Sequence, residues 1–230
     1  MALERAVPIP ALERLATYLR CLRELEGDRV LTVSSQEMEQ LTGVSAAQFR
    51  KDLSYFGEFG RRGIGYDVVK LRERIAQQLR VDRDQAVLLV GAGHLGSALI
   101  AYPGWRAYHF RIAAIFDQDP AKIGSTIRRL TVQDAAQIGA VNARVAARLG
   151  IIAVPAAAAQ PVADALIGAG VTGLINFAPA RLEVPPGIVV REVCFICELA
   201  VLSYLNAGPE TSAPEFDDAT SGKPNARLAS

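Results

Sequence analysis

Gly91, Gly93 and Gly96 have the spacing of a phosphate-binding loop between a strand and a helix. They belong to the hexapeptide 91–96, which directly follows the apolar run 86–90. In such a loop the first glycine allows a tight turn, the second lets backbone amides approach a pyrophosphate, and the third lets the next helix pack closely. The helix N-terminus adds positive potential. We therefore predict a pyrophosphate site made by Gly91, Ala92, Gly93, His94, Leu95 and Gly96.

An acidic residue follows at the distance expected for a group that binds ribose. Asp117 ends the apolar run 112–116 and comes 21 residues after Gly96, close to the roughly 20 of a dinucleotide fingerprint. A carboxylate there accepts from both ribose hydroxyls and repels a 2′-phosphate. Its neighbours, including Gln118, supply no arginine to bind one. The sequence therefore predicts NAD+ and NADH as ligands in preference to the phosphorylated cofactors.

A second group of residues has the chemistry of a helix that reads DNA. Phe49, Leu53 and Phe56 stand at i, i+4 and i+7 and face a core, so cations and hydroxyls share the opposite face. In a major groove, Arg takes the paired acceptors of guanine, while Lys and Ser hold phosphates. A solvated helix face is the alternative. The predicted DNA-binding residues of this helix are Ser45, Ala47, Arg50, Lys51, Ser54 and Tyr55.

A glycine-rich segment after this helix favours the DNA interpretation. Residues 57–66 are typical of a hairpin, with Arg61 and Arg62 at its tip and Gly63 beside them. A narrow minor groove attracts arginine at such a tip. The helix and the hairpin together predict a winged helix-turn-helix.

Capping signals indicate where the helices of this domain begin. Ser34 with Glu37, and Ser45 with Gln48, fit the capping-box spacing, and residues 41–44 form the turn between two short helices. An earlier amphipathic helix, ending near residues 27–28, is predicted by leucines that face the core at helical spacing. These are Leu12, Leu15, Leu19, Leu22 and Leu25.

The rest of the chain alternates apolar runs with alanine-rich segments that are compatible with helices. This rhythm predicts a doubly wound parallel sheet, which binds ligands just outside the carboxyl ends of its strands. Pro155 and the pair Ala178 and Pro179 follow such ends, where ordinary turn chemistry is the alternative. The runs are 86–90, 112–116, 150–154, 173–177 and 188–190.

Length and composition favour two small domains in a soluble, cytoplasmic chain. The 230 residues are half hydrophobic, yet no apolar run approaches the roughly 20 residues that span a bilayer. Three cysteines are too few for a disulfide framework. We expect a DNA-binding domain with its linker at 1–84, a Rossmann domain with a C-terminal helix at 85–206, and a disordered tail at 207–230.

The balance of charge predicts that the chain works as a dimer. A formal net charge of +1 argues against a protein that coats nucleic acid nonspecifically. A monomer with few basic residues on its reading head neutralises few phosphates and binds weakly. A homodimer on palindromic double-stranded operator DNA would double the contacts.

Several segments together resemble the Rex family of bacterial redox-sensing repressors. The resemblance runs from about Val7 to Leu205. It implies a homodimer of winged-helix and Rossmann domains, with a C-terminal helix swapped between subunits. It also implies that the protein represses when NAD+ is high and leaves DNA when NADH binds. The segments are 50–60, 62–67, 91–96, 102–105, 116–120 and 176–179.

The same resemblance implies roles for individual residues. Arg50, Lys51 and Tyr55 would contact the operator, and Arg62 would enter the minor groove. Arg20 and Tyr102, in turn, would belong to a switch between the domains. These roles come from the family pattern and not from spacing.

The nicotinamide end of the site is also implied by the resemblance, with one departure. Phe195 of the partner subunit would lie beside the ring, with Phe177, Ala178 and Pro179 completing an apolar pocket. Such a pocket disfavours the cationic ring of NAD+ and accepts the neutral ring of NADH. Where the family usually carries an aspartate, this chain has Cys194, and a thiol cannot make that charged switch contact.

Cys194 and Cys197 form a C-x-x-C pair with two interpretations. One is a pair of small apolar residues on a buried helix, because free cysteines are commonly buried. The other is a thiol switch that supplements NADH sensing. We predict no metal site, since zinc would require about four ligands and no neighbouring Cys or His completes the set.

Two other functions compete with a repressor. An NAD-dependent dehydrogenase with an accessory helical domain would need a catalyst. Neither His94 nor His109 has an obvious hydride-transfer position, although Tyr102 and Lys122 remain acid–base candidates. The other is a regulator that binds a different nucleotide, against which Asp117 and the complete glycine loop argue. We favour the repressor, with no catalytic residues.

Overall fold

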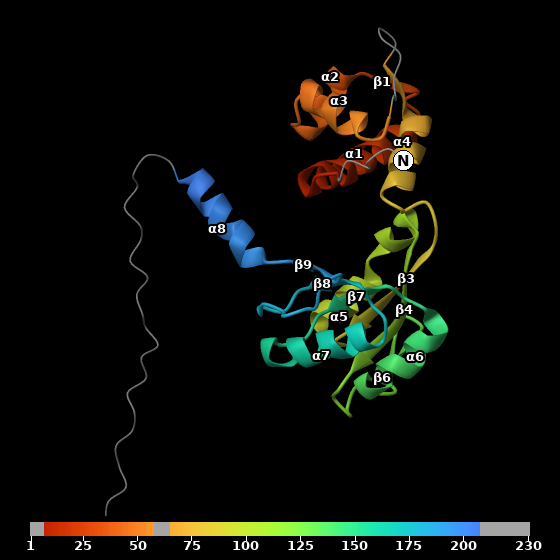
Figure 1. Cartoon of the computed structure of the whole chain (residues 1–230), viewed down its shortest axis with the longest axis vertical. Helices are drawn as coiled ribbons and strands as arrows, with labels where there is room; N and C mark the ends of the chain where they lie inside the picture. Colours follow the sequence, from red (N-terminus) through yellow and green to blue (C-terminus); the bar gives the residue numbers. More distant parts are fainter. Residues whose placement is uncertain (1–6, 58–64, 208–230) are drawn as a thin grey trace, which may run out of the picture. The chain divides into compact units, whose positions relative to one another are not determined.

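The computed structural model describes residues 7–57 and 65–207 (Figure 1). The chain divides into two compact units, Met1–Glu192 and Val193–Ser230. None of the helices in the described segments is long and apolar enough to cross a membrane.

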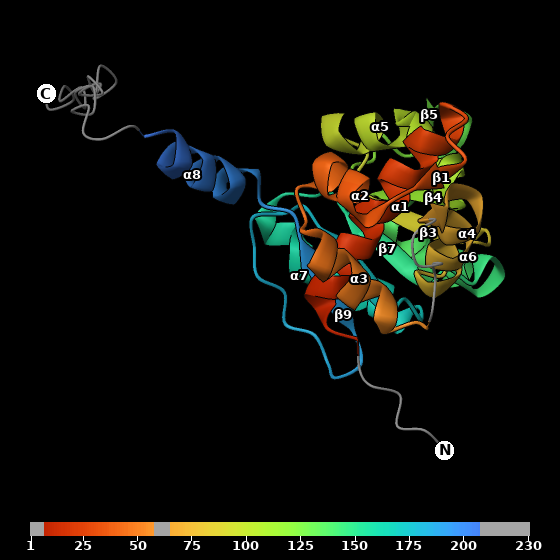
Figure 2. The same ribbon diagram turned by 90° about the horizontal axis from the view of Figure 1, so that it is seen from above.

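The N-terminal part of the first unit is a small helical domain with a short antiparallel strand pair. Three of its helices, α1, α2 and α3, pack together and lie close in both views (Figure 1, Figure 2). Strand β1 pairs with β2 through Thr32 with Asp67 and Val33 with Tyr66. The elements are α1 (Ile9–Gly27), β1 (Thr32–Val33), α2 (Ser35–Thr42), α3 (Ala46–Ser54), β2 (Tyr66–Asp67) and α4 (Val68–Gln78).

The two capping predictions have different outcomes. Ser34 makes the full box: its hydroxyl accepts from the Glu37 amide at 3.1 Å, and the Glu37 carboxylate accepts from the Ser34 amide at 2.7 Å. Ser45 makes only half of one, accepting from the Gln48 amide at 3.2 Å. In a full box the Gln48 side chain would accept from the Ser45 amide. It instead donates to the buried Asp52 carboxylate at 2.7 Å, and a hydrogen bond to a charged acceptor is stronger than one between neutral groups.

One apolar core holds this domain together. Of the predicted stripe of α1, Leu15, Leu19 and Leu22 are buried and the two end leucines are partly buried. Phe49 and Leu53 of α3 belong to the same core, as the spacing predicted. The charged, helix-compatible stretch 67–84 was predicted to be the linker between the domains, yet its helix α4 joins this core and packs against α1. The buried residues of α4 are Val68, Leu71, Ile75 and Ala76.

The following part is a doubly wound α/β fold. Within the described residues, seven strands form one sheet in the order β5-β6-β4-β3-β7-β8-β9, parallel except for β5 with β6. The order reverses between β3 and β7, which is where such sheets bind ligands. The elements are β3 (Gln85–Val90), α5 (His94–Ala101), η1 (Pro103–Tyr108), β4 (Phe110–Asp117), β5 (Thr126–Ile127), β6 (Leu130–Asp134), η2 (Ala135–Gln137), α6 (Ile138–Val145), β7 (Leu149–Ile152), α7 (Ala156–Gly168), β8 (Gly173–Asn176) and β9 (Val189–Glu192).

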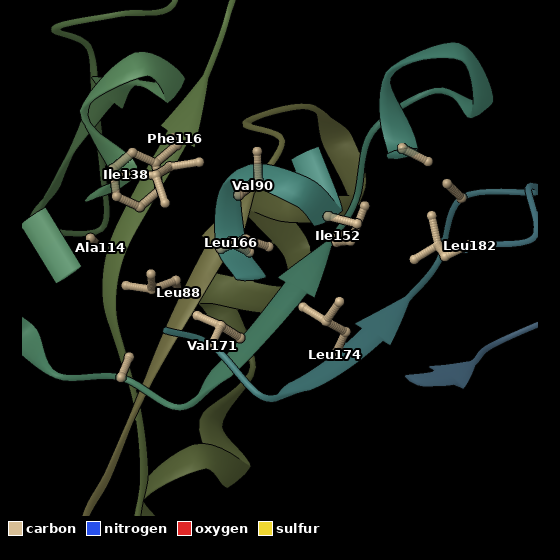
Figure 3. Packing of buried hydrophobic residues seen from close by; sticks show 14 of the residues in the cluster. Leu88, Val90, Ala114, Phe116, Ile138, Ile152, Leu166, Val171, Leu174 and Leu182 are labelled. Carbon is tan, nitrogen blue, oxygen red and sulfur yellow. The ribbon is translucent and has the colours of Figure 1, made fainter. Parts of the chain in front are cut away.

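The two faces of the sheet are covered unequally. On one face, α6 and α7 bury a core that includes Leu88, Phe116 and Leu166 (Figure 3). On the other, α5 and η1 cover β3 and β4. Beside them lies an apolar hollow of about 410 Å³ over β7, β8 and β9, where Ile175 and Val189 are exposed.

The second unit contains helix α8 (Phe195–Asn206). Every residue of this helix is exposed in the single chain, although most are apolar. The exposed large side chains are Phe195, Ile196, Leu199, Val201, Leu202, Tyr204 and Leu205.

Candidate functional site

Helix α3 presents the predicted reading face to solvent. Ala47, Arg50, Lys51 and Ser54 are all exposed, opposite the buried Phe49. The remaining predicted residues flank this face, with Ser45 at the N-cap and Tyr55, half-buried, at the C-cap. The Arg50 guanidinium donates to the Ser35 hydroxyl at 2.7 Å. The predicted wing residues Arg61, Arg62 and Gly63 lie outside the described residues.

A fully buried carboxylate fixes α3 to α1. Asp52 is 0% exposed. Its carboxylate accepts two hydrogen bonds from Arg14, at 2.6 and 2.7 Å, one from the Tyr18 hydroxyl at 2.9 Å and one from the Gln48 amide. Burial opposes ionisation, but these donors outweigh it and lower the pKa of Asp52. Asp52 was not among the predicted functional residues, because its only signal in the sequence is a charged side chain on the core-facing side of α3.

The three glycines of the nucleotide loop differ in how much space the fold leaves for a side chain. Gly91 has φ +109°, and a Cβ there would lie 2.2 Å from the Ala153 carbonyl oxygen. A Cβ on Gly96 would lie 1.9 Å from the Gly91 oxygen. Gly93 has φ −83° and nothing within 4 Å of an added Cβ. The fold itself therefore demands two glycines, while the third leaves open space where a pyrophosphate would approach the backbone.

The rest of the loop lies at the start of α5. Ala92 is buried, and its amide donates to Asp117 at 2.8 Å, which ties the loop to the end of β4. His94 and Leu95 are the first two residues of α5 and are exposed. The free amides of this helix end can bind an anion.

Asp117 is nearly buried and held by three donors in the described chain. The amides of Ala92 and Asp119 and the Lys122 ammonium donate to it at 2.8, 2.9 and 3.1 Å. Burial opposes ionisation, but the amides and Lys122 lower the pKa of Asp117. A carboxylate has about four acceptor positions, so one remains for a ribose hydroxyl instead of the two that the sequence analysis expected.

A cavity of about 250 Å³ brings Asp117 and Gln118 together with Pro155. It also contains Lys122, a cation that the sequence analysis considered only as an acid–base candidate. Val90, at the end of β3, and Val154, just after β7, also line the cavity. The cavity therefore lies where the strand order of the sheet reverses. The cavity has the size and the polar groups for part of a nucleotide.

The residues predicted around nicotinamide follow β8, in a loop organised by a buried asparagine. Asn176 accepts from the Ala178 amide at 3.0 Å and donates to the Ala180 carbonyl at 2.8 Å. Ala178 is buried, Phe177 half-buried and Pro179 exposed. Phe195 belongs to the second unit, so its predicted place beside this loop stays a prediction.

Comparisons with known proteins identify the family. Residues 82–180 match a family model described as a CoA binding domain, and residues 6–54 match one described as "Putative DNA-binding protein N-terminus". Over 225 residues the chain is 41% identical to the redox-sensing transcriptional repressor Rex of Streptomyces avermitilis, covering 96% of this chain and 89% of the relative. Over 197 residues it is 46% identical to the Rex of Chloroflexus aggregans, covering 86% and 93%. The chain belongs to the Rex family.

Crystal structures of the Rex-family repressor RSP share the fold. RSP in complex with β-NAD+ and operator DNA aligns with a TM-score of 0.82 at 34% identity, covering 87% of this chain and 93% of RSP. RSP in complex with β-NADH aligns with a TM-score of 0.80 at 33% identity, covering 87% and 94%. These likenesses confirm the predicted α/β class, with an N-terminal DNA-binding domain before a Rossmann-like sheet.

The predicted switch residues of this Rex-family chain have local partners. Arg20 lies 3.8 Å from Glu24, and Tyr102 packs edge-on against Trp105 with ring centroids 6.1 Å apart. Cys194 is the N-cap of α8 and is bonded to Cys197. The cysteines are exposed in the single chain, whereas the first interpretation expected free thiols on a buried helix.

Proposed function

We propose that this chain is a homodimeric repressor that binds operator DNA when NADH is low and releases it when NADH binds. The observation that carries this proposal is the pairing, in one chain, of a braced, cationic α3 with a nucleotide loop open at Gly93. Relatives named as redox-sensing repressors support it. So does the fold shared with a repressor whose complexes contain NADH, NAD+ and operator DNA.

DNA recognition falls to α3 and to the predicted wing, which precedes β2 in the chain. Arg50 and Lys51 carry the charge, with Ser54 and Tyr55 beside them. Arg61 and Arg62 extend the contact into a minor groove. The Asp52 network keeps α3 at a fixed angle to α1, so that its face meets the groove without losing entropy on binding.

The dinucleotide binds across the carboxyl ends of β3 and β7. The amides at the start of α5 hold the pyrophosphate, with Gly93 allowing its approach. Asp117 accepts a ribose hydroxyl through its remaining acceptor position. The negative charge of Asp117 disfavours a 2′-phosphate, although the Lys122 ammonium at 3.1 Å partly offsets it.

The apolar faces of the chain support a dimer with a swapped α8. Leu199, Leu202 and Leu205 of α8 are exposed. The hollow over β7 to β9 is apolar, with exposed Ile175 and Val189. We propose that α8 of one protomer covers the sheet face of its partner. The substitutions Leu199→Glu and Leu202→Glu are then expected to make the protein monomeric, as measured by its mass in analytical ultracentrifugation. The exposed surface variant Arg144→Ala should stay dimeric.

No catalytic step is part of the proposed function. His94 is exposed at the start of α5, and His109 pairs with Asp84 at 3.1 Å. Lys122, an acid–base candidate in the dehydrogenase alternative, is paired with Asp117, and this ion pair raises the pKa of Lys122. A proton acceptor needs the opposite shift. Because its relatives are transcriptional repressors, we also propose that this chain works in the cytoplasm.

The test separates nucleotide binding from folding with two matched substitutions. Gly93→Ala and Gly139→Ala each add a Cβ with no neighbour within 4 Å. We expect both variants to fold and to bind operator. NADH affinity, measured by calorimetry, should fall about tenfold or more only for Gly93→Ala, since that methyl occupies the pyrophosphate approach. Equal NADH affinity in the two variants would contradict the assigned loop.

A further inference from the structure

Two cysteines at the start of α8 form a site that neither the DNA face nor the nucleotide loop uses. Cys194 and Cys197 are joined by a disulfide, with their Cα atoms 5.3 Å apart, a separation at which cysteines bridge without backbone movement. Cys194 is the N-cap, and its sulfur accepts the Cys197 amide at 3.1 Å. The bond therefore closes the first turn of α8.

The surroundings of this pair favour reactive thiols. Both cysteines are exposed in the single chain. A thiol in a C-x-x-C pair at a helix N-terminus ionises more readily than a free thiol, because the helix end favours a negative charge. Cys21 is the opposite case: it is 5% exposed, and burial raises its pKa. Thiol chemistry is thus confined to one pair.

A metal does not explain the pair. Within the described residues, no cluster of three or more His, Cys, Asp or Glu side chains is placed to hold an ion. Two thiols alone fall short of the roughly four ligands that zinc takes.

We propose that Cys194 and Cys197 are a reversible dithiol–disulfide site that changes how strongly the repressor prefers NADH to NAD+. This inference rests on the proposed function. The two cysteines bracket Phe195, the side chain expected beside the nicotinamide of the partner. They also lie just after Glu192, where the first compact unit ends, and at the start of α8. The redox state of the pair therefore affects the segment that connects the nucleotide-binding domain to α8, the helix proposed to lie in the dimer interface.

The chemistry needs a peroxide as oxidant and a thiol as reductant. The Cys194 thiolate attacks a peroxide oxygen, the O–O bond breaks, and a sulfenic acid and hydroxide form. The hydroxide takes up the proton that the Cys194 thiol had released and becomes water. The Cys197 thiol then attacks that sulfur, forming the S–S bond and releasing a second water. The sum is two thiols and hydrogen peroxide giving one disulfide and two waters. Reduction by external thiols returns both protons and both electrons through a mixed disulfide.

The direction of the effect follows from charge. A reduced pair can hold a thiolate next to Phe195, and a nearby anion stabilises the cationic ring of NAD+. Oxidation removes that charge and leaves the neutral ring of NADH unaffected. The disulfide-closed turn also fixes the backbone of Phe195 before NADH binds, which lowers the entropy lost when NADH binds. Both effects favour NADH after oxidation.

The experiment compares the reduced and peroxide-oxidised full-length dimer. Intact mass after alkylation in denaturant should show three labels on the reduced chain and one, on Cys21, after oxidation. The ratio of NAD+ to NADH dissociation constants should rise about fivefold on oxidation. The NADH needed for half release of operator, at fixed NAD+, should fall in parallel.

Three variants make the result specific. Cys194→Ser and Cys197→Ser should each abolish the difference between the reduced and oxidised forms, and either one alone suffices if the other fails to fold. Cys21→Ala should keep it. An unchanged ratio after complete disulfide formation, or a ratio that falls, would overturn the inference. If reduced protein fails to release operator with NADH, the proposed function itself is wrong, which is a separate outcome.

Discussion

Asp52 in the DNA-binding domain and Asp117 in the nucleotide-binding domain are chemically alike but differ in how many of their acceptor positions the described chain fills. Both are buried, both have a lowered pKa, and each pairs with a cation. Asp52 has its acceptor positions filled by Arg14, Tyr18 and Gln48. Asp117 accepts three hydrogen bonds from the described chain and lines a cavity.

This difference shows that burial and a lowered pKa do not by themselves identify a ligand site. A saturated carboxylate braces the fold, since nothing further can bind it without breaking a bond. A carboxylate with a vacant acceptor position beside a cavity can serve a ligand. Substitution at Asp52 should therefore act on stability first, and substitution at Asp117 should act on binding first.

Asp52→Asn is expected to have the largest effect. The amide keeps the shape but removes the charge opposite Arg14, and breaking such a buried pair costs about 3 kcal/mol of unfolding free energy. Chemical denaturation of the DNA-binding domain measures it. Lys70→Gln is the control, because the Lys70–Asp67 pair is exposed and contributes little. NADH affinity should be unchanged in both variants. A loss of NADH affinity in Asp52→Asn would contradict a role for Asp52 in stability alone.

Acid should remove the same stabilisation without any substitution. The folded pKa of Asp52 lies below its unfolded value, which is about 3.9. Its contribution is therefore complete above that pH and is lost as the pH falls through the folded pKa. We expect the difference in unfolding free energy between the parent chain and Asp52→Asn to shrink on acidification. A constant difference would show that Asp52 does not titrate in this way.

Arg50→Ala sharpens the comparison from the DNA side. Arg50 is exposed on α3 and contributes to no core, so the variant should fold normally and lose about 2 kcal/mol of operator affinity. Fluorescence anisotropy at fixed salt measures the loss. Arg144→Ala removes an exposed cation from α6 and should leave operator binding unchanged. Equal losses in both variants would indicate a nonspecific charge effect.

Asp117→Asn should weaken the ligand more than the fold. The amide can still accept from one backbone donor, so stability should change by about 1 kcal/mol. NADH affinity should fall about tenfold, because a charged acceptor for ribose is lost. The variant should bind operator but release it only at higher NADH. Asp84→Asn, at the amino ends of the strands, is the matched control.

Lys122→Gln is expected to have the smallest effect. The Lys122 side chain is 41% exposed, so its pairing with Asp117 is worth about 0.5 kcal/mol. Without it, Asp117 repels a 2′-phosphate more fully, and the preference for NADH over NADPH should rise slightly. Competition binding with both cofactors measures the ratio. A preference that falls would assign Lys122 to ribose binding instead.

The sequence predicted features that depend on local spacing. The glycine loop, the strand before it and the exposed face of α3 each follow from residues within one or two helical turns, and the structure agrees with them. Ser34 and Glu37 show this well, because a capping box needs only neighbours in sequence.

Features that depend on distant partners, on turn geometry or on very short strands were not predicted from the sequence. Asp52 finds Arg14 across 38 residues, and no local pattern indicates that a charge on the inner face of α3 is compensated. Lys122 reaches Asp117 through a turn whose geometry the sequence does not specify. Strand β5 has two residues, too short for periodicity to identify. The C-x-x-C pair was recognised with two interpretations open, and which one holds depends on the local fold at the start of α8.

Operator binding of the intact dimer during separate titrations with NADH, NAD+ and NADPH at fixed salt tests the central claim most directly. The account predicts release by NADH at concentrations where NAD+ and NADPH leave the complex bound. It would be contradicted if operator stayed bound at every NADH concentration that saturates the nucleotide site, or if all three cofactors released it equally.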